Sequence, residues 1–305
     1  MTNRSYPIFL VLAVLISLSC GEKKTNDTTE EDAQDLPDYD YRLFKNSPVW
    51  DLAQAVERQD STEIKRIVNA GNVDVNYQEP KFGNTLLIVS VINQQLASVE
   101  TLLRLNADPD KHNTYDGSTA LIEAAEITGS DDNTTFLRTL LRYGADPNQA
   151  ETGDRKPGNT LRKSPLLAAC SDLQGTTPIQ KVKVLVEAGA DVNYEDEFNH
   201  FPLGQAVMNK HYDVILYLLQ KGADHEKMII DRSKFQANGK KLYIADILRE
   251  HLFPLGSKEH ELKMQVVALL KTKGVDYRKT AIPDFVVKKV KEEYPGSWQE
   301  YLDAY

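Results

Sequence analysis

Six histidines are the first residues to consider for acid–base or metal chemistry in this chain of 305 residues. They lie far apart, at His112, His200, His211, His225, His251 and His260. Zinc sites need histidines or cysteines at short, fixed spacing, and no such group occurs. The sequence also contains no Gly-x-Ser-x-Gly nucleophile turn, no phosphate-binding loop and no Gly-x-Gly-x-x-Gly segment. We therefore predict no enzyme, no metal and no cofactor.

The two cysteines stand in different surroundings. Cys170 ends the apolar run 166–169, and no neighbouring basic residue would lower the pKa of its thiol. We interpret it as a small core residue. Cys20 instead follows the charge-free stretch 6–19, which comes after a short segment containing Arg4. A membrane-spanning helix needs about 20 apolar residues, so this stretch is too short to span and is typical of a secretory signal.

The sequence Ser19-Cys20-Gly21 resembles the cleavage site of a bacterial lipoprotein, although Ser17 and Leu18 depart from the usual pattern. The resemblance implies removal of residues 1–19 and a lipid anchor on the Cys20 sulfur, with acyl chains that hold the protein on a membrane. It places the protein in a bacterial cell envelope, facing the periplasm or the cell surface, and Gly21 favours the outer membrane. Two other interpretations stay open: a signal cut nearby that leaves Cys20 as a free thiol, and an uncleaved anchor.

Residues 20–46 are expected to form an acidic, flexible tether. The part from Gly21 to Asp40 holds eight acids and two lysines, and its apolar residues are only Ala33, Leu36 and Tyr39. So little apolar surface cannot offset the entropy of ordering the chain. The formal charge of the whole sequence is −9, which argues against nucleic-acid binding because that function needs a basic surface.

A short turn sequence recurs along the remainder of the chain. It occurs at Asn69–Asn76, Asn106–Asp110, Gly144–Asn148, Gly189–Asn193 and Gly222–Asp224, and more weakly at Gly274–Asp276. Each turn follows an apolar pair such as Leu102-Leu103, and roughly 16 to 20 residues before that pair stands a Thr, Ser or Pro. Thr and Ser cap the first turn of a helix, Pro fits that turn, and Gly ends a helix. The pattern predicts a repeated unit of two helices and a hairpin.

This order of features resembles the ankyrin-repeat family, whose period is 33 residues. The resemblance covers residues 47–280 and implies an all-α solenoid of five to six repeats, closed by a C-terminal cap over 281–305. The repeats are expected at 47–78, 79–112, 113–149, 160–194, 195–227 and 236–280. The His of the family's Thr-Pro-Leu-His motif is replaced in every repeat, by Ile88, Ile122, Leu167 and Gly204. The hydrogen bonds of that His must be missing or replaced.

The resemblance also implies that hairpin tips and exposed positions of the first helices line one face, where partner proteins dock. The candidate residues at the tips are Lys81, Phe82, Asn113, Tyr115, Tyr194 and Phe198. The candidates on the first helices are Glu123, Asp172, Gln205 and Asn209, with Asn93 at a similar position. The aromatic tips either bind a partner or cover the neighbouring hairpin. The insert 150–163, with Arg155-Lys156 and Arg162-Lys163, is a separate candidate for an acidic partner.

We therefore predict a lipid-anchored, monomeric and non-catalytic protein that binds a protein partner. Two other classes stay open. One is an immunity-type protein that neutralises a toxin, and the other is an enzyme with its site in the diverged segment 228–305.

Overall fold

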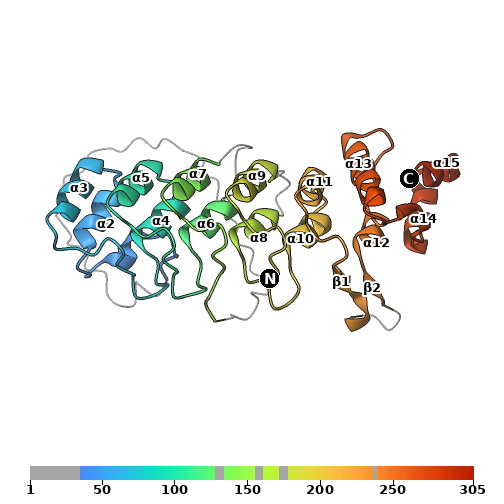
Figure 1. Ribbon diagram of the computed structural model, residues 1–305. Coiled ribbons are helices and arrows are strands. Elements are labelled where there is room, and N and C mark those ends of the chain that lie inside the picture. Colours follow the sequence, from blue (N-terminus) through green and yellow to red (C-terminus); the bar gives the residue numbers. More distant parts are fainter. Residues whose placement is uncertain (1–34, 128–133, 155–160, 172–177, 236–238) are drawn as a thin grey trace, which may run out of the picture.

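The computed structural model describes residues 35–127, 134–154, 161–171, 178–235 and 239–305, and these ranges contain 14 α-helices. The helices stack as pairs in one row (Figure 1), which confirms the predicted all-α repeat solenoid. The segment 1–19 and Cys20 lie outside the described residues. Within the described ranges, no helix has both the length and the apolar character that crossing a bilayer requires.

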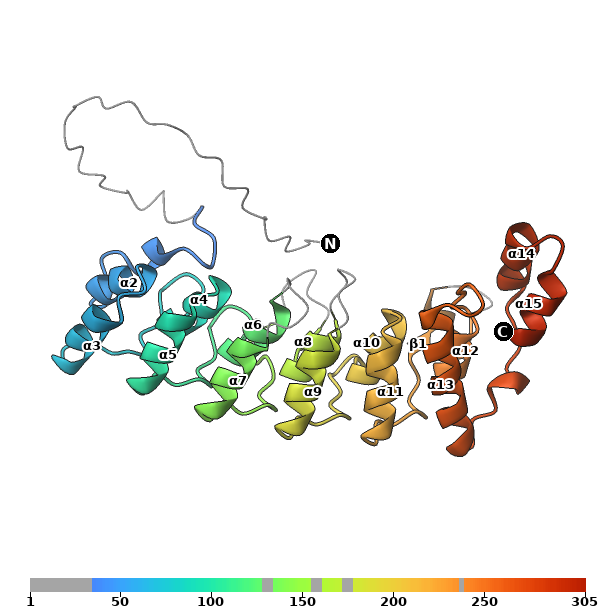
Figure 2. The same cartoon turned by 90° about the horizontal axis from the view of Figure 1, so that it is seen from above.

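Each repeat is a first helix, a short turn and a second helix. The first five pairs are α2 (Trp50–Glu57) with α3 (Ser61–Asn69), α4 (Leu86–Ile92) with α5 (Leu96–Arg104), α6 (Ala120–Glu126) with α7 (Thr135–Arg142), α8 (Pro165–Cys170) with α9 (Ile179–Glu187), and α10 (Pro202–Met208) with α11 (Tyr212–Gln220). The row bends so that the first helices follow its inner edge and the second helices its outer edge (Figure 2). We call the inner edge, together with the hairpin tips, the concave face.

A sixth pair and a terminal pair complete the row. Strands β1 (Ile230–Asp231) and β2 (Lys241–Leu242) form an antiparallel hairpin in which Ile230 faces Leu242. They precede α12 (Ile244–Leu248) and α13 (Lys258–Thr272), which are followed by α14 (Asp284–Glu293) and α15 (Trp298–Ala304). The short 3-10 helices are η1 (Tyr41–Phe44), η2 (Arg232–Lys234) and η3 (Tyr277–Lys279).

The first helices begin with the capping residues that the sequence predicts. The hydroxyl oxygens of Thr85, Thr119 and Ser164 accept hydrogen bonds from the backbone N–H three residues later, at 3.3, 3.4 and 3.2 Å. These amides lack a partner inside the helix, so each cap satisfies one exposed donor. The three donors belong to Ile88, Ile122 and Leu167, which replace the family's His and are fully buried. Apolar burial therefore takes the place of the missing His side chain in these repeats.

The recurring turn joins each repeat to the next through a ladder of side-chain acceptors. The Oδ1 atoms of Asn76, Asp110, Asn148 and Asn193 accept from the backbone N–H groups of Asp108, Asp146, Asp191 and Asp224 in the following repeat, at 2.7, 2.9, 2.8 and 2.8 Å. Each of these following aspartates then accepts from the residue two positions after it, for example Asp108 from Asp110 at 2.9 Å. The turn sequence therefore fixes the spacing of neighbouring repeats as well as its own shape.

The predicted tether 20–46 is partly wrong. Residues 20–34 lie outside the described part of the chain, but η1 is packed into the repeat core. Tyr41, Leu43 and Phe44 are buried, and the Tyr41 hydroxyl donates to Gln95 Oε1 at 2.5 Å. The three large apolar side chains at 41–44 provide the burial that the acidic residues before them lack, and this burial orders the segment.

The terminal pair docks on the sixth repeat through its tyrosines. Val286, Val290, Tyr301 and Tyr305 form a small second core. The Tyr301 hydroxyl donates to the Phe253 carbonyl at 2.6 Å, and the Tyr305 hydroxyl lies 2.8–3.2 Å from the carbonyl oxygens of Leu248, Arg249 and His251. These carbonyls belong to the end of α12, so α15 caps a helix of the preceding repeat.

Candidate protein-binding surface

A buried acceptor side chain organises each hairpin tip. Glu79 accepts from the backbone N–H groups of Lys81, Phe82 and Asn84, at 2.7 to 3.1 Å. Asn113 Oδ1 accepts from residues 115, 116 and 117 at 2.9 to 3.1 Å, and Asp196 accepts from residues 198 and 200 at 2.8 and 2.9 Å. Asn113, a candidate for the binding surface, is therefore buried in its own hairpin. Its short side chain turns inward and accepts from three backbone amides of the tip.

Neighbouring hairpins also bond to each other. The Phe82 carbonyl accepts from Thr114 N–H at 3.1 Å, and the Asp116 carbonyl accepts from Gly153 N–H at 3.0 Å. Gly117 lies at the second contact with a φ of +75°, and a Cβ there would lie 2.2 Å from the Gly153 nitrogen. Only glycine fits this approach. The tips therefore form one braced ridge rather than separate loops.

The aromatic candidates on this ridge differ in their surroundings. The rings of Phe82 and Tyr115 meet edge to face, with centroids 5.4 Å apart, and Lys81 Nζ lies 4.7 Å from the Phe82 centroid. Phe82 is half-buried and covers the neighbouring hairpin, as one of the two interpretations expects. Tyr115 is 39% exposed and Phe198 is 53% exposed, so these two rings offer apolar area to a partner.

The candidates along the first helices are more enclosed than expected. Glu123 is buried, so the prediction that it is exposed is wrong. Asn209 is half-buried and its Nδ2 donates to the Cys170 carbonyl at 3.0 Å, and Gln205 beside it is half-buried. The Tyr194 hydroxyl donates to the Arg162 carbonyl at 2.7 Å, which makes it a brace between hairpins. Asp172 lies outside the described residues.

The basic pair Arg162-Lys163 is occupied inside the protein. Lys163 Nζ lies 2.5 Å from Glu126 Oε1 and 3.7 Å from Glu151 Oε1. Burial alone would lower the pKa of Lys163, but these two carboxylates raise it above its ordinary value. Burial raises the pKa of Glu151 to about 7. Arg162 donates to the Glu151 carbonyl at 2.7 Å and pairs with Glu197 at 3.2 Å. The pair therefore holds the insert closed, and Arg155-Lys156 lie outside the described residues.

Two basic side chains are buried in the C-terminal third, and no motif in the sequence predicts them. Lys263 Nζ donates to the His251 carbonyl at 3.0 Å and lies 3.4 Å from the Tyr305 ring centroid. The Arg249 guanidinium lies 3.9 Å from the Tyr277 ring centroid. Burial, with Arg249 and Arg278 nearby, lowers the pKa of Lys263 to about 6. Tyr305 closes this cluster, which gives it a packing role.

In the described part of the chain, the side chains that could bind a metal or act as a nucleophile do not form a cluster. Among the described residues, no three His, Cys, Asp or Glu side chains lie together in a way that could hold a metal ion. His251 Nδ1 bonds to the Tyr212 hydroxyl at 2.8 Å, and burial lowers the pKa of His251 to about 3. Cys170 is fully buried and burial raises the pKa of its thiol, which confirms it as a core residue.

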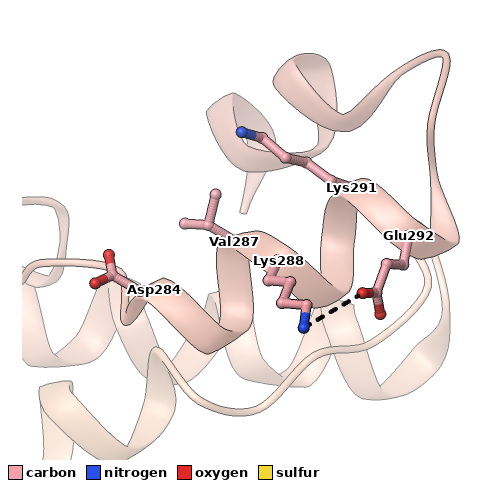
Figure 3. Close-up of a pocket in the computed structure, with 5 residues that line it drawn as sticks. All are labelled: Asp284, Val287, Lys288, Lys291 and Glu292. Atoms are coloured by element: carbon pink, nitrogen blue, oxygen red, sulfur yellow. Dashed lines mark ion pairs between the residues drawn. The ribbon is translucent and has the colours of Figure 1, made fainter.

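A shallow depression on α14 has no convergent chemistry either. Its lining residues lie along one exposed helix face, where Lys288 pairs with Glu292 at 3.9 Å (Figure 3). Lys291 turns towards the ring of Trp298, at 4.4 Å from its centroid. These contacts are those of a solvated helix that packs on α15.

Comparison with known proteins agrees with the geometry. A family model described as ankyrin repeats (three copies) matches residues 52–151 and 132–229. Alpha-latrocrustotoxin-Lt1a of Latrodectus tredecimguttatus is 36% identical over 132 residues. That match covers 43% of this chain and 8% of the toxin, so this chain corresponds to a small part of that protein's length. The helix pairs, the ladder between the repeats and the family match together show that this chain belongs to the ankyrin-repeat family.

Proposed function

We propose that this protein is a non-catalytic, monomeric lipoprotein that is tethered to a bacterial membrane and binds a protein partner with its concave face. Ankyrin repeats generally serve as protein-interaction modules, which supports the binding role. The observation that carries the proposal is the braced ridge of hairpins, whose buried acceptors hold the backbone at Tyr115 and Phe198 while their rings are exposed. A surface ordered before binding loses less entropy when a partner docks.

The binding proposal is tested by crosslinking in the native envelope, followed by identification of the captured protein. Phe198→Ala is expected to weaken the captured complex by at least fivefold, because an exposed aromatic ring at an interface often contributes 1 to 2 kcal/mol. The matched control is Phe285→Ala, which removes an equally exposed ring (56%) on α14, away from the ridge. Equal binding by both variants and the wild type would exclude the ridge as the docking surface.

The anchoring proposal rests on the sequence 1–20 and has its own test. Because Cys170 is buried, a maleimide reagent applied to the folded protein reports only on Cys20. A lipid-modified protein resists the reagent, takes up labelled palmitate and fractionates with the outer membrane, and Cys20→Ala abolishes the palmitate label. A chain cut nearby without lipid would instead react once with maleimide and stay unlabelled by palmitate.

Among the described residues, no specific contact favours an immunity role or an enzyme. In the described part of 228–305, Arg249 and Lys263 form a buried cluster of ionisable groups that Tyr305 closes. Protein binding therefore stands as the proposed function.

A further inference from the structure

The segment before η1 crosses the concave face of the first repeats. Figure 2 shows this start of the blue chain on the side of the first helices, beside α2 and α4. Lys81 Nζ donates to the Leu36 carbonyl at 2.8 Å, Asn84 Nδ2 to the Asp38 carbonyl at 3.0 Å, and Asn93 Nδ2 to the Tyr39 carbonyl at 2.7 Å. We call Leu36–Tyr39 the strap, and Lys81, Asn84 and Asn93 the donor row.

The donor row bonds to the main chain of the strap. Its three bonds end on carbonyl oxygens, which every residue carries, and the strap presents them around a turn in which the Asp40 N–H donates to the Pro37 carbonyl at 3.1 Å. A row of side-chain donors with this property can hold segments of different sequence that adopt the same turn. The row also lies where a partner of the hairpin ridge would dock, because Lys81 and Asn84 flank Phe82 at the tip.

The strap is held much less firmly than the helix that follows it. Leu36 is only half-buried against the core and Tyr39 is 39% exposed, whereas Tyr41 and Phe44 are buried. A net contribution of about 1 kcal/mol each means that these three hydrogen bonds, two of them exposed, hold the strap weakly. The chain can therefore open at Asp40 while η1 stays packed.

We propose that the strap is displaceable, and that an acidic segment of the protein partner that adopts the same turn replaces it on the donor row. The present occupant is itself acidic, with Asp35, Asp38 and Asp40 around an apolar Leu36, and Lys81 supplies the matching cation. This inference rests on the proposed function and names the chemistry of the partner. The strap then limits access to the first two repeats until a partner segment of higher affinity displaces it.

The test uses a fluorescent peptide of residues 33–40, AQDLPDYD, and the folded full-length protein. Leu36→Gly with Pro37→Gly loosens the strap without touching the donor row. The peptide is expected to bind this loosened protein at least tenfold more tightly than the wild type. Tenfold corresponds to a groove that is open in at most about a tenth of the wild-type molecules.

Controls distinguish peptide binding at the donor row from non-specific binding. Adding Asn84→Ala and Asn93→Ala to the loosened protein is expected to remove the gain, whereas adding Lys288→Ala and Glu292→Ala, an exposed pair on α14, leaves it intact. A peptide with its three aspartates changed to lysine is expected to bind at least fivefold more weakly. Circular dichroism and the melting temperature establish that each variant is folded.

Equal peptide affinity of the wild-type and loosened proteins, or no binding to either, would overturn the proposal. If the loosened variant does not fold, the wild type decides the question by NMR. Excess peptide must then shift the side-chain amide signals of Asn84 and Asn93, and unchanged signals refute displacement. Loss of partner capture by the Phe198→Ala protein is a separate result, so the failure of the strap proposal and that of the proposed function can be told apart.

Discussion

The ladder between repeats contains one rung that is built on an aspartate, and replacing that residue by asparagine should stabilise the protein. Asn148 and Asn193 each use both ends of their amide. Oδ1 accepts from the next repeat, and Nδ2 donates to the carbonyl of Gly189 at 3.1 Å or of Gly222 at 3.4 Å. Asp110 Oδ1 accepts the equivalent bond from the Asp146 N–H at 2.9 Å, but its side chain has no N–H group that could donate. We expect an asparagine at position 110 to place its Nδ2 against the Gly144 carbonyl, as Asn148 and Asn193 do against Gly189 and Gly222.

Asp110→Asn should therefore raise the unfolding free energy by about 1 kcal/mol at neutral pH. A new hydrogen bond contributes about 0.5–1.5 kcal/mol, and the change also removes an unfavourable carboxylate. Partial burial, followed by the charges of Asp108 and Asp146, raises the pKa of Asp110 above its ordinary value. A raised pKa means that the folded state binds the proton more readily than the unfolded state. The cost of the charge is thus complete above the folded pKa and disappears as the pH falls below about 4.

The assay is thermal unfolding at about pH 7.5 and about pH 3.5. The gain predicts a melting temperature about 2–4 °C higher at the upper pH and little changed at the lower one. The matched control is Asn148→Asp, which creates the same defect one rung further on and should lower the melting temperature by a similar amount. A gain of equal size at both pH values, or no gain at neutral pH, would refute the electrostatic part of the reasoning.

Three further outcomes follow from other contacts. Gly117→Ala should lower the unfolding free energy by about 1–3 kcal/mol, because the new Cβ would lie 2.2 Å from the Gly153 nitrogen at a residue with positive φ. Calorimetry measures this loss, and an unchanged melting temperature would contradict the tight hairpin contact. Tyr305→Phe leaves three carbonyls without their shared donor and should cost about 1–3 kcal/mol, seen as faster amide exchange in α15 than in α4. Lys263→Met should stabilise the protein at pH 7. Because the folded pKa of Lys263, about 6, lies below its unfolded value, wild-type stability rises with pH from about 6 to about 10, and the variant should lose that slope in urea unfolding.

The local pattern of the repeats could be predicted because it depends on neighbours in the sequence. Thr85, Thr119 and Ser164 cap helices from within their own repeat, and the apolar residues after them follow the period of one helix. The turn residues were recognised for the same reason. Their bonds to the next repeat, such as Asn76 to Asp108, join groups 32 positions apart and leave no separate mark in the sequence.

The errors share a physical cause. A polar side chain at a hairpin is exposed or buried according to which amides need a partner, and Asn113 turns inward to accept from three amides of its own tip. Glu123 is buried on α6 against the neighbouring elements that the fold brings to it. The predicted tether is too long because acids dominate its composition, although Tyr41 and Phe44 are buried in the core. The sequence suggests an acidic partner for Lys163, whereas the structure supplies Glu126 from the preceding repeat.

The ladder also determines how the molecule would respond to tension. Each rung links one repeat to the next, so the rungs act like springs in series and a pull between the two ends passes through all of them. The extension adds up over the row, but the rupture force is that of the weakest link. The rungs of Asn76 and Asp110 have one bond each where Asn148 and Asn193 have two, so a stretched chain should part first at one of these two rungs, within the first three repeats.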